Sequence, residues 1–115
     1  MSNMSAANDL NLARGFAEEL GRELGANLVR LSIFGSRARR DHDYESDFDL
    51  VVVLRNPTGA VRSTIHQRAL GWEISRGVDL STKILGEADF LRLSQGSDRF
   101  WQEFRRDEQV LWPTS

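Results

Sequence analysis

The sequence predicts one α+β domain in which helices alternate with the strands of a β-sheet. Its length of 115 residues is that of a single domain. Segments with apolar residues at three- and four-residue steps, typical of amphipathic helices, alternate with segments in which every second residue is apolar, typical of half-buried strands. Since no internal repeat or interdomain linker interrupts this order, we expect one hydrophobic core.

The first periodic segment predicts a helix that begins at Asn8 or Asp9 and ends at Gly25. Six apolar residues form its buried stripe: Leu10, Ala13, Phe16, Ala17, Leu20 and Leu24. Residues 1–8 are expected to be a flexible N-terminus. Residues 9–115 are then the single domain.

Three segments predict strands because apolar residues alternate in them with other residues. The first covers residues 29–33. The second, residues 47–54, turns its even-numbered residues toward the core and places Asp47 and Asp49 on the opposite face. The third, residues 78–84, has a polar opposite face.

The remaining elements are three helices and a short strand. Residues 56–57, Asn-Pro, predict a cap followed by a first-turn proline, in a helix that Gly77 ends. A short helix from Glu87 to about residue 94 follows, and Ser97 is expected to cap the next one. Residues 110–112 predict an edge strand.

The composition excludes several classes of protein. The chain has no cysteine, which excludes disulfide and thiolate-zinc frameworks. Its longest apolar run, residues 50–54, is far shorter than the roughly 20 residues that cross a bilayer. The N-terminal stretch lacks the features of a signal peptide, so we expect a cytoplasmic protein without membrane contact. Because 15 basic and 17 acidic residues nearly cancel, direct nucleic-acid binding is not expected.

The acidic residues of the second strand indicate a metal site. Asp47 and Asp49 lie on one face about 7 Å apart, and at an effective dielectric constant of 20 their charges repel by about 2 kcal/mol. A divalent cation reverses the sign of that energy. Asp79, on the polar face of the next strand, can supply a third carboxylate. Such an all-oxygen cluster favours Mg²⁺ or Mn²⁺ and a two-metal phosphoryl or nucleotidyl transfer. A solvated acidic strand end is the alternative.

A glycine-serine pair follows the first strand. Gly35 has no Cβ, so a phosphate can approach its backbone, and the N–H groups and the Ser36 hydroxyl can bind phosphate oxygens. Alone, Gly-Ser is an ordinary turn. Its position at the end of one strand, while the acidic pair opens the next, favours a phosphate site.

Residues 34–53, FGSRARRDHDYESDFDLVVV, resemble the minimal nucleotidyltransferase branch of the DNA polymerase beta-like superfamily. The family pattern is Gly-Ser, ten residues, then Asp-x-Asp, and Asp79 aligns with the third acidic residue of the family. Arg40 departs from it, since many members have Gly there. The resemblance implies the nucleotidyltransferase fold, a mixed β-sheet with helices packed on one face and the active site on the other.

The same resemblance implies that the protein transfers AMP from ATP to an acceptor hydroxyl and releases pyrophosphate. It assigns the nucleotide phosphates to four residues: Gly35, Ser36, Arg37 and Arg39. It assigns two Mg²⁺ ions and catalysis to three acids: Asp47, Asp49 and Asp79. Asp79 would bind the metal that activates the acceptor hydroxyl, or take its proton.

Members of this branch often act as antitoxins beside a HEPN ribonuclease toxin and adenylylate a tyrosine of that toxin. The resemblance therefore implies a protein partner of this kind. Two alternatives stay open: a binding module that silences a partner by occlusion, and an enzyme that modifies a small hydroxylated molecule. The aromatic residues of the chain also leave self-association open.

Overall fold

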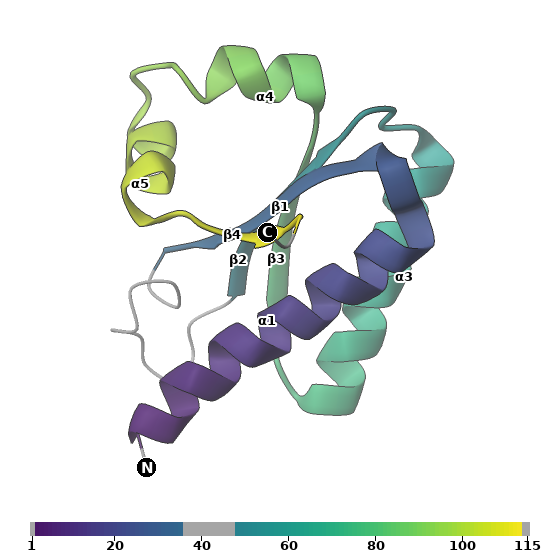
Figure 1. Ribbon diagram of the computed structural model, residues 1–115, viewed down its shortest axis with the longest axis vertical. Coiled ribbons are helices and arrows are strands. Elements are labelled where there is room, and N and C mark those ends of the chain that lie inside the picture. The colour runs from purple at the N-terminus through teal and green to yellow at the C-terminus, as the bar shows by residue number, and fades with distance from the viewer. Residues whose placement is uncertain (1, 36–47, 114–115) are drawn as a thin grey trace.

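The computed structural model describes residues 2–35 and 48–113 (Figure 1). Its elements, in chain order, are α1 (Ser2–Leu24), the 3₁₀ turn η1 (Gly25–Asn27), β1 (Leu28–Phe34), β2 (Phe48–Leu54), α3 (Gly59–Arg76), β3 (Leu80–Gly86), α4 (Glu87–Leu93), α5 (Arg99–Asp107) and β4 (Gln109–Trp112). The strands form one sheet in the order β3-β2-β1-β4. The predicted α+β class with a mixed sheet is confirmed.

The pairing of the strands brings three chain segments to one end of the sheet. β1 is antiparallel to β2 and β4, whereas β2 and β3 are parallel. Phe34 near the end of β1 pairs with Asp49 near the start of β2, and Asp49 pairs with Ser81 of β3. The end of β1 and the beginnings of β2 and β3 are therefore neighbours.

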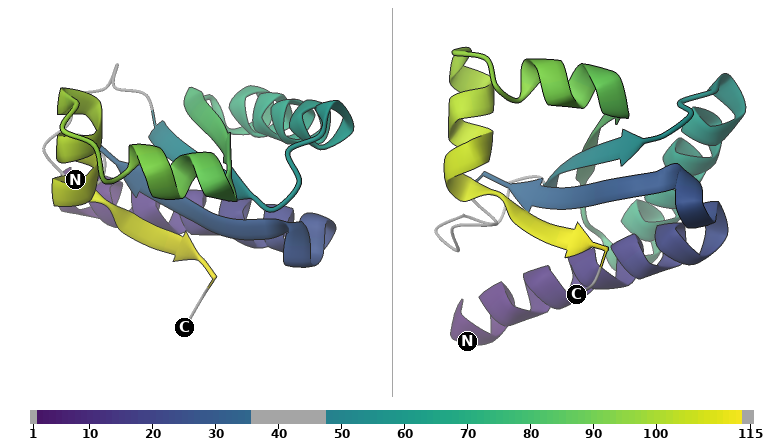
Figure 2. Two further views of the ribbon diagram at one scale, coloured as in Figure 1. Left: turned by 90° about the horizontal axis from the view of Figure 1, so that it is seen from above. Right: turned by 45° about the horizontal axis from the view of Figure 1, so that its top comes forward.

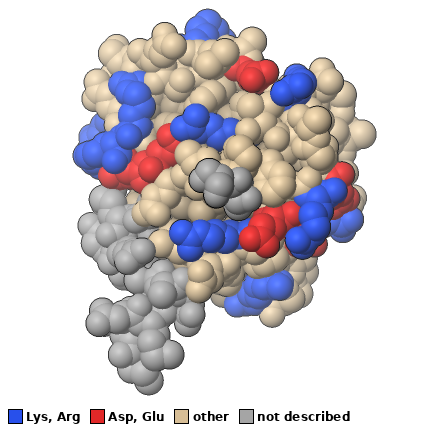
Figure 3. All heavy atoms as spheres, viewed as in Figure 1, with Lys and Arg blue, Asp and Glu red and all other residues tan. Residues whose placement is uncertain are grey.

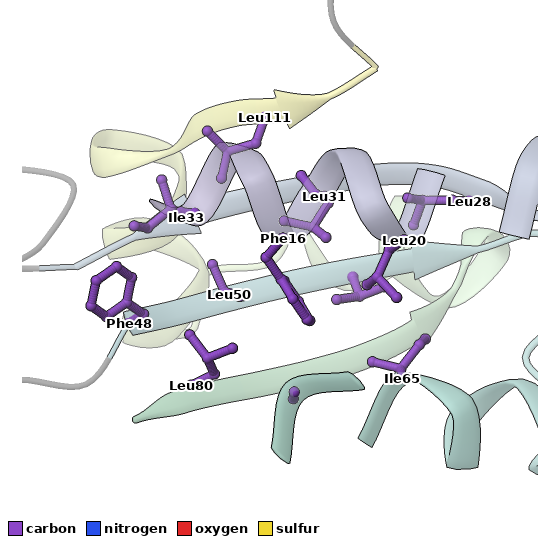
Figure 4. Packing of buried hydrophobic residues seen from close by; sticks show 14 of the residues in the cluster. Phe16, Leu20, Leu28, Leu31, Ile33, Phe48, Leu50, Ile65, Leu80 and Leu111 are labelled. Carbon is purple, nitrogen blue, oxygen red and sulfur yellow. The ribbon is translucent and has the colours of Figure 1, made fainter. Parts of the chain in front are cut away.

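Helices α1 and α3 cover one face of the sheet. Phe16 and Leu20 of α1 pack with Ile65 of α3 and with buried strand residues into one layer (Figure 4). The even-numbered residues of β2 all lie in this layer, as the alternation predicted: Phe48, Leu50, Val52 and Leu54. This layer is the main core of the described fold.

The opposite face of the sheet, where the active site was expected, is partly covered by helices as well. Figure 2 shows α4 and α5 on the opposite side of the sheet from α1. Val51 and Val53 pack there against Phe90 of α4 and against Trp101 and Phe104 of α5. Apolar side chains of α4 and α5 thus cover part of the face where the acidic residues were expected. The candidate site is confined to one end of that face.

Several helix boundaries differ from the prediction. α1 begins at Ser2 rather than at Asn8 or Asp9. The N-cap of α3 is Thr58, whose side chain accepts a hydrogen bond from the N–H of Val61, so residues 56–57 precede the cap. The N-cap of α5 is Asp98 rather than Ser97. In both caps the polar residue chosen from the sequence lies one or two positions too early.

A partly buried carboxylate just before β4 ties this part of the chain to β1. Glu108, just before β4, accepts two hydrogen bonds from the guanidinium of Arg30, at 2.7 and 2.5 Å. It also accepts one from the hydroxyl of Ser32, which is completely buried. These bonds satisfy a carboxylate that is largely shielded from water, so they hold the end of α5 against β1.

The charges on the surface are mixed. Basic and acidic side chains are interspersed on the face drawn in Figure 3, without a broad area of one sign. Within the described residues, the helices are too short or too polar to span a bilayer.

Candidate functional site

Gly35 follows β1 directly and lies beside Asp49 of β2. Its φ of +80° is a left-handed conformation that residues with a side chain rarely adopt. A Cβ atom at Gly35 would also lie 2.7 Å from Oδ2 of Asp49, well inside ordinary contact distance. Two independent reasons thus require glycine here, and a backbone without a side chain faces the carboxylate.

Asp79 precedes β3 and is held in the sheet by its backbone. Its carbonyl oxygen accepts a hydrogen bond from the N–H of Phe48 at 2.9 Å, next to the pair formed by Phe48 and Leu80. Asp49 pairs with Ser81, and residues two apart in a strand share a face, so Asp79 belongs to the same face as Asp49. Strand spacing and rise put their Cα atoms about 8 Å apart. The half-buried Asp49 and the exposed Asp79 can therefore reach a shared ligand.

Glu73, in the last turn of α3, holds the residue that follows Asp79. Its Oε2 accepts a hydrogen bond from the N–H of Leu80 at 2.8 Å, on the side of β3 where no further strand lies among the described residues. An acid near a helix C-terminus is unfavourable by about 0.3–1 kcal/mol, so this hydrogen bond is the compensating contact. Glu73 therefore positions the backbone at Asp79. Glu73 was not predicted as a site residue, although an acid in a last helical turn was an available signal.

Helix α5 forms an aromatic wall over this end of the sheet. Phe100 and Phe104 contact Phe34 edge to face, with ring centroids 5.2 and 5.5 Å away. Phe100 is also contacted by Lys83, whose Nζ lies 5.3 Å from the ring centroid. Phe100 thus connects β1 to β3 across the first half of β2. No role in the site was predicted from the sequence for these aromatic residues or for Lys83.

Four predicted site residues lie outside the described residues: Ser36, Arg37, Arg39 and Asp47. Arg40, the departure from the family pattern, lies outside them as well. The predicted site residues within the described part of the chain are Gly35, Asp49 and Asp79. All three lie at the same end of the sheet.

The described carboxylates fit a Mg²⁺ ion. Asp49 and Asp79 offer the oxygen ligands that this ion prefers, from neighbouring strands. The missing side chain at Gly35 leaves space beside Asp49 that a Cβ would fill. No group of three or more His, Cys, Asp or Glu side chains that could hold a metal ion occurs within residues 2–35 and 48–113, and Asp47 lies outside that part. The pair therefore suits an ion that takes its other ligands from elsewhere, as Mg²⁺ does from substrate phosphates.

An ion pair between α1 and α3, on the opposite face of the sheet, shifts the pKa values of both its members. Arg68 of α3 donates two hydrogen bonds to Glu23 of α1, at 2.7 and 3.0 Å. These bonds and the attraction between the charges lower the pKa of Glu23 and raise the pKa of Arg68. The pair joins the two helices of the main core layer and has a structural role.

Residues 13–107 match the nucleotidyltransferase domain family. Among curated proteins, none has significant similarity to the chain. Among solved structures, a candidate nucleotidyltransferase from Sulfolobus solfataricus is 24% identical to this chain, with a TM-score of 0.59. The match covers 96% of this chain and 86% of the Sulfolobus chain.

Two toxin–antitoxin structures are also similar in fold. One, solved with AMP-PNP, is 18% identical, and the other, a mutant of the pair MntA–HpeT, is 16% identical. Each has a TM-score of 0.57, and each match covers 89% of this chain and 74% of the matched chain. At these identities, the likeness establishes a shared fold.

Proposed function

Because the chain belongs to the nucleotidyltransferase domain family, we propose that it transfers AMP from ATP to an acceptor hydroxyl and releases pyrophosphate. The observation that carries this proposal is the close approach of Gly35 to Asp49. It combines a bare backbone, suited to phosphate oxygens, with a carboxylate, suited to the cation that accompanies them. Asp79 adds a second carboxylate from the neighbouring strand.

The chemistry at this site would be an in-line displacement on the α-phosphorus. The acceptor oxygen forms a bond to that phosphorus while the bond to the pyrophosphate oxygen breaks. Asp79 either takes the proton that leaves the acceptor hydroxyl or helps to hold the metal near it. Two Mg²⁺ ions, when bound, supply positive charge that offsets the charge on the phosphates.

The remaining roles follow from the family pattern. Asp47 would join Asp49 in holding the metal ions, and Ser36 would join Gly35 in binding the β and γ phosphates. Arg37 and Arg39 would offset the charge that develops on the triphosphate. We place the reaction in the cytoplasm, where ATP is available.

For the acceptor, we propose a tyrosine of a HEPN-type toxin. Two solved structures of similar fold are toxin–antitoxin structures, and one of them was solved with AMP-PNP, an ATP analogue. A tyrosine hydroxyl on a partner protein meets the chemical requirement for an acceptor. Modification of that tyrosine would silence the toxin.

The test is label transfer from [α-³²P]ATP with Mg²⁺ to the protein encoded beside this one. We expect the unmodified protein to label that neighbour, and peptide mass spectrometry to place AMP on a tyrosine. Asp49→Asn should lose the transfer. Asp89→Asn is the matched control, since Asp89 is an exposed carboxylate on α4, and it should retain activity. An active Asp49→Asn variant, or labelling that does not require Mg²⁺, would refute the proposal.

Occlusion without chemistry is the competing function, and one surface feature favours it. A cleft of about 230 Å³ lies between α4 and β4, with apolar Leu91 and Val110 exposed at its lining. A partner seated there would be silenced by contact alone. If Asp49→Asn neutralises the partner as well as the unmodified protein does, this second function is the correct one.

A further inference from the structure

Lys83 is the single lysine of the chain, and it lies on the same sheet face as the two described carboxylates. It pairs with Val51, while Ser81, two residues earlier, pairs with Asp49. Lys83 therefore lies one step further along the face than Asp49, on the adjacent strand. Strand spacing and rise put the Cα atoms of Lys83 and Asp49 about 8 Å apart.

The present contact of the Lys83 ammonium is with an aromatic ring rather than with an acid. Its Nζ lies 5.3 Å from the centroid of Phe100, and within the described residues it forms no ion pair. A cation over an exposed ring is held more weakly than a cation hydrogen-bonded to an anion. An anion that entered beside Asp49 would therefore draw the ammonium away from the ring.

The surroundings of Lys83 favour a phosphate as that anion. Its long flexible side chain can carry the ammonium over the start of β2, toward the bare backbone at Gly35. Phe34 and Phe100 line the same space on the side of α5. The phosphates of a nucleotide bound to Mg²⁺ at Asp49 would enter this space.

We propose that Lys83 binds a phosphate group of the nucleotide at this site and so helps to set the affinity for triphosphates. The proposal rests on the proposed function and adds a residue that the family pattern of Gly-Ser and Asp-x-Asp does not contain. Lys83 acts by charge and hydrogen bonding to the substrate, and Phe100 holds the ammonium in place before the substrate arrives.

The main test measures binding by calorimetry, with two probes in the presence of Mg²⁺: ATP without an acceptor, and inorganic tripolyphosphate. We expect Lys83→Met to weaken the binding of both probes about tenfold or more, as for the loss of a hydrogen bond to a charged group. Lys83→Arg should stay within about threefold of the unmodified protein. Arg55→Met is the matched control, because Arg55 is exposed just after the far end of β2, and it should bind both probes normally.

A second measurement needs no variant. Because Lys83 is the only lysine, acetylation of side-chain amines can modify a single site, which peptide mass spectrometry resolves from the N-terminal amine. ATP with Mg²⁺ should slow the acetylation of Lys83, and so should tripolyphosphate.

The outcomes separate this proposal from the proposed function. If the unmodified protein transfers AMP but Lys83→Met binds tripolyphosphate normally, the role of Lys83 is refuted and the proposed function stands. The role is also refuted if Lys83→Met weakens ATP binding and leaves tripolyphosphate binding unchanged, since Lys83 would then contact another part of the nucleotide. If the unmodified protein binds neither probe, both proposals fail.

Discussion

Substitution of Gly35 by alanine tests the geometry on which the candidate site depends. Gly35 combines a left-handed backbone with a close approach to Asp49, so an added methyl group meets two separate penalties. The change should therefore affect both the stability of the fold and the binding of nucleotide. Because alanine adds a single carbon, both effects can be assigned to a known position in space.

The magnitude follows from the two penalties. A left-handed backbone costs a residue with a side chain about 1–2 kcal/mol. The new Cβ would lie 2.7 Å from Oδ2 of Asp49, and relieving such a contact costs about 1–3 kcal/mol more. We expect Gly35→Ala to lower the free energy of unfolding by at least about 2 kcal/mol. For a domain of this size that is a fall in Tm of about 8 °C or more.

Two other glycines allow the cost of the left-handed backbone to be measured apart from the cost of the close contact. Gly25 and Gly77 have φ of +57° and +65°, and a Cβ at either would find nothing within 4 Å. Gly25→Ala and Gly77→Ala should therefore show the backbone penalty alone. Thermal unfolding followed by circular dichroism measures all three variants, and calorimetry with Mg²⁺ and ATP should show lost binding for Gly35→Ala only.

The contact with Asp49 can be removed to complete the test. In an Asp49→Ala background, the nearest Asp49 atom left to a Cβ at Gly35 is the Cβ of residue 49, at 3.8 Å, an ordinary contact distance. The extra destabilisation by Gly35→Ala should then disappear, as the double-mutant cycle measures it. If Gly35→Ala is no more destabilising than the two control substitutions, or binds nucleotide normally, the close approach is not what the site requires.

Three further predictions follow from charges and buried polar groups. Ser32→Ala should lower the free energy of unfolding by about 1–2 kcal/mol, measured in urea, because Glu108 loses a buried donor. Arg68 lowers the pKa of Glu23, so the stabilisation by this pair is present at neutral pH and lost as the pH falls through the folded pKa. Glu23→Gln should thus lower Tm slightly at about pH 7 and have no such effect at about pH 3. Asp47→Asn should abolish AMP transfer yet keep or raise Tm in chelator, since it removes a like-charge repulsion; a large loss of Tm would instead indicate a structural hydrogen bond.

The local pattern was sufficient to predict most elements of the fold. Alternation correctly assigned the residues of β2 that face the core layer under α1 and α3, because every second residue of a strand lies on the same face whatever the neighbouring strand is. Gly77 ends α3 with φ of +65°, as expected for a glycine after a helix. Helix starts were less accurate. At Thr58 and Asp98 several polar residues compete to be the cap, and the choice depends on the path of the chain into the helix.

The relation between the carboxylates could be predicted only in part. Asp49 was placed on a face by alternation, but its pairing with Ser81 joins residues far apart in the sequence. That register decides whether Asp79 is a neighbour of Asp49, and local periodicity carries no information about it. The aromatic wall of α5 depends on the same kind of contact. Lys83 and Glu73 were missed for this reason, since each has a role only through a partner from another element.

Three locally unfavourable choices meet at one end of the sheet. Asp49 is a carboxylate in β2, whose other residues are all buried. Gly35 lies against that carboxylate where no side chain fits, and Glu73 puts negative charge at a helix C-terminus. Sequences selected for folding alone tend to make local preference and global structure agree, so isolated conflicts arise anywhere, whereas conflicts gathered at one place indicate selection for something else. A cation bound to the carboxylates would make their negative charge favourable, and the triphosphate that it carries would bind the bare backbone at Gly35. These local conflicts are independent of the family match, and they lie at the same end of the sheet as the predicted site residues.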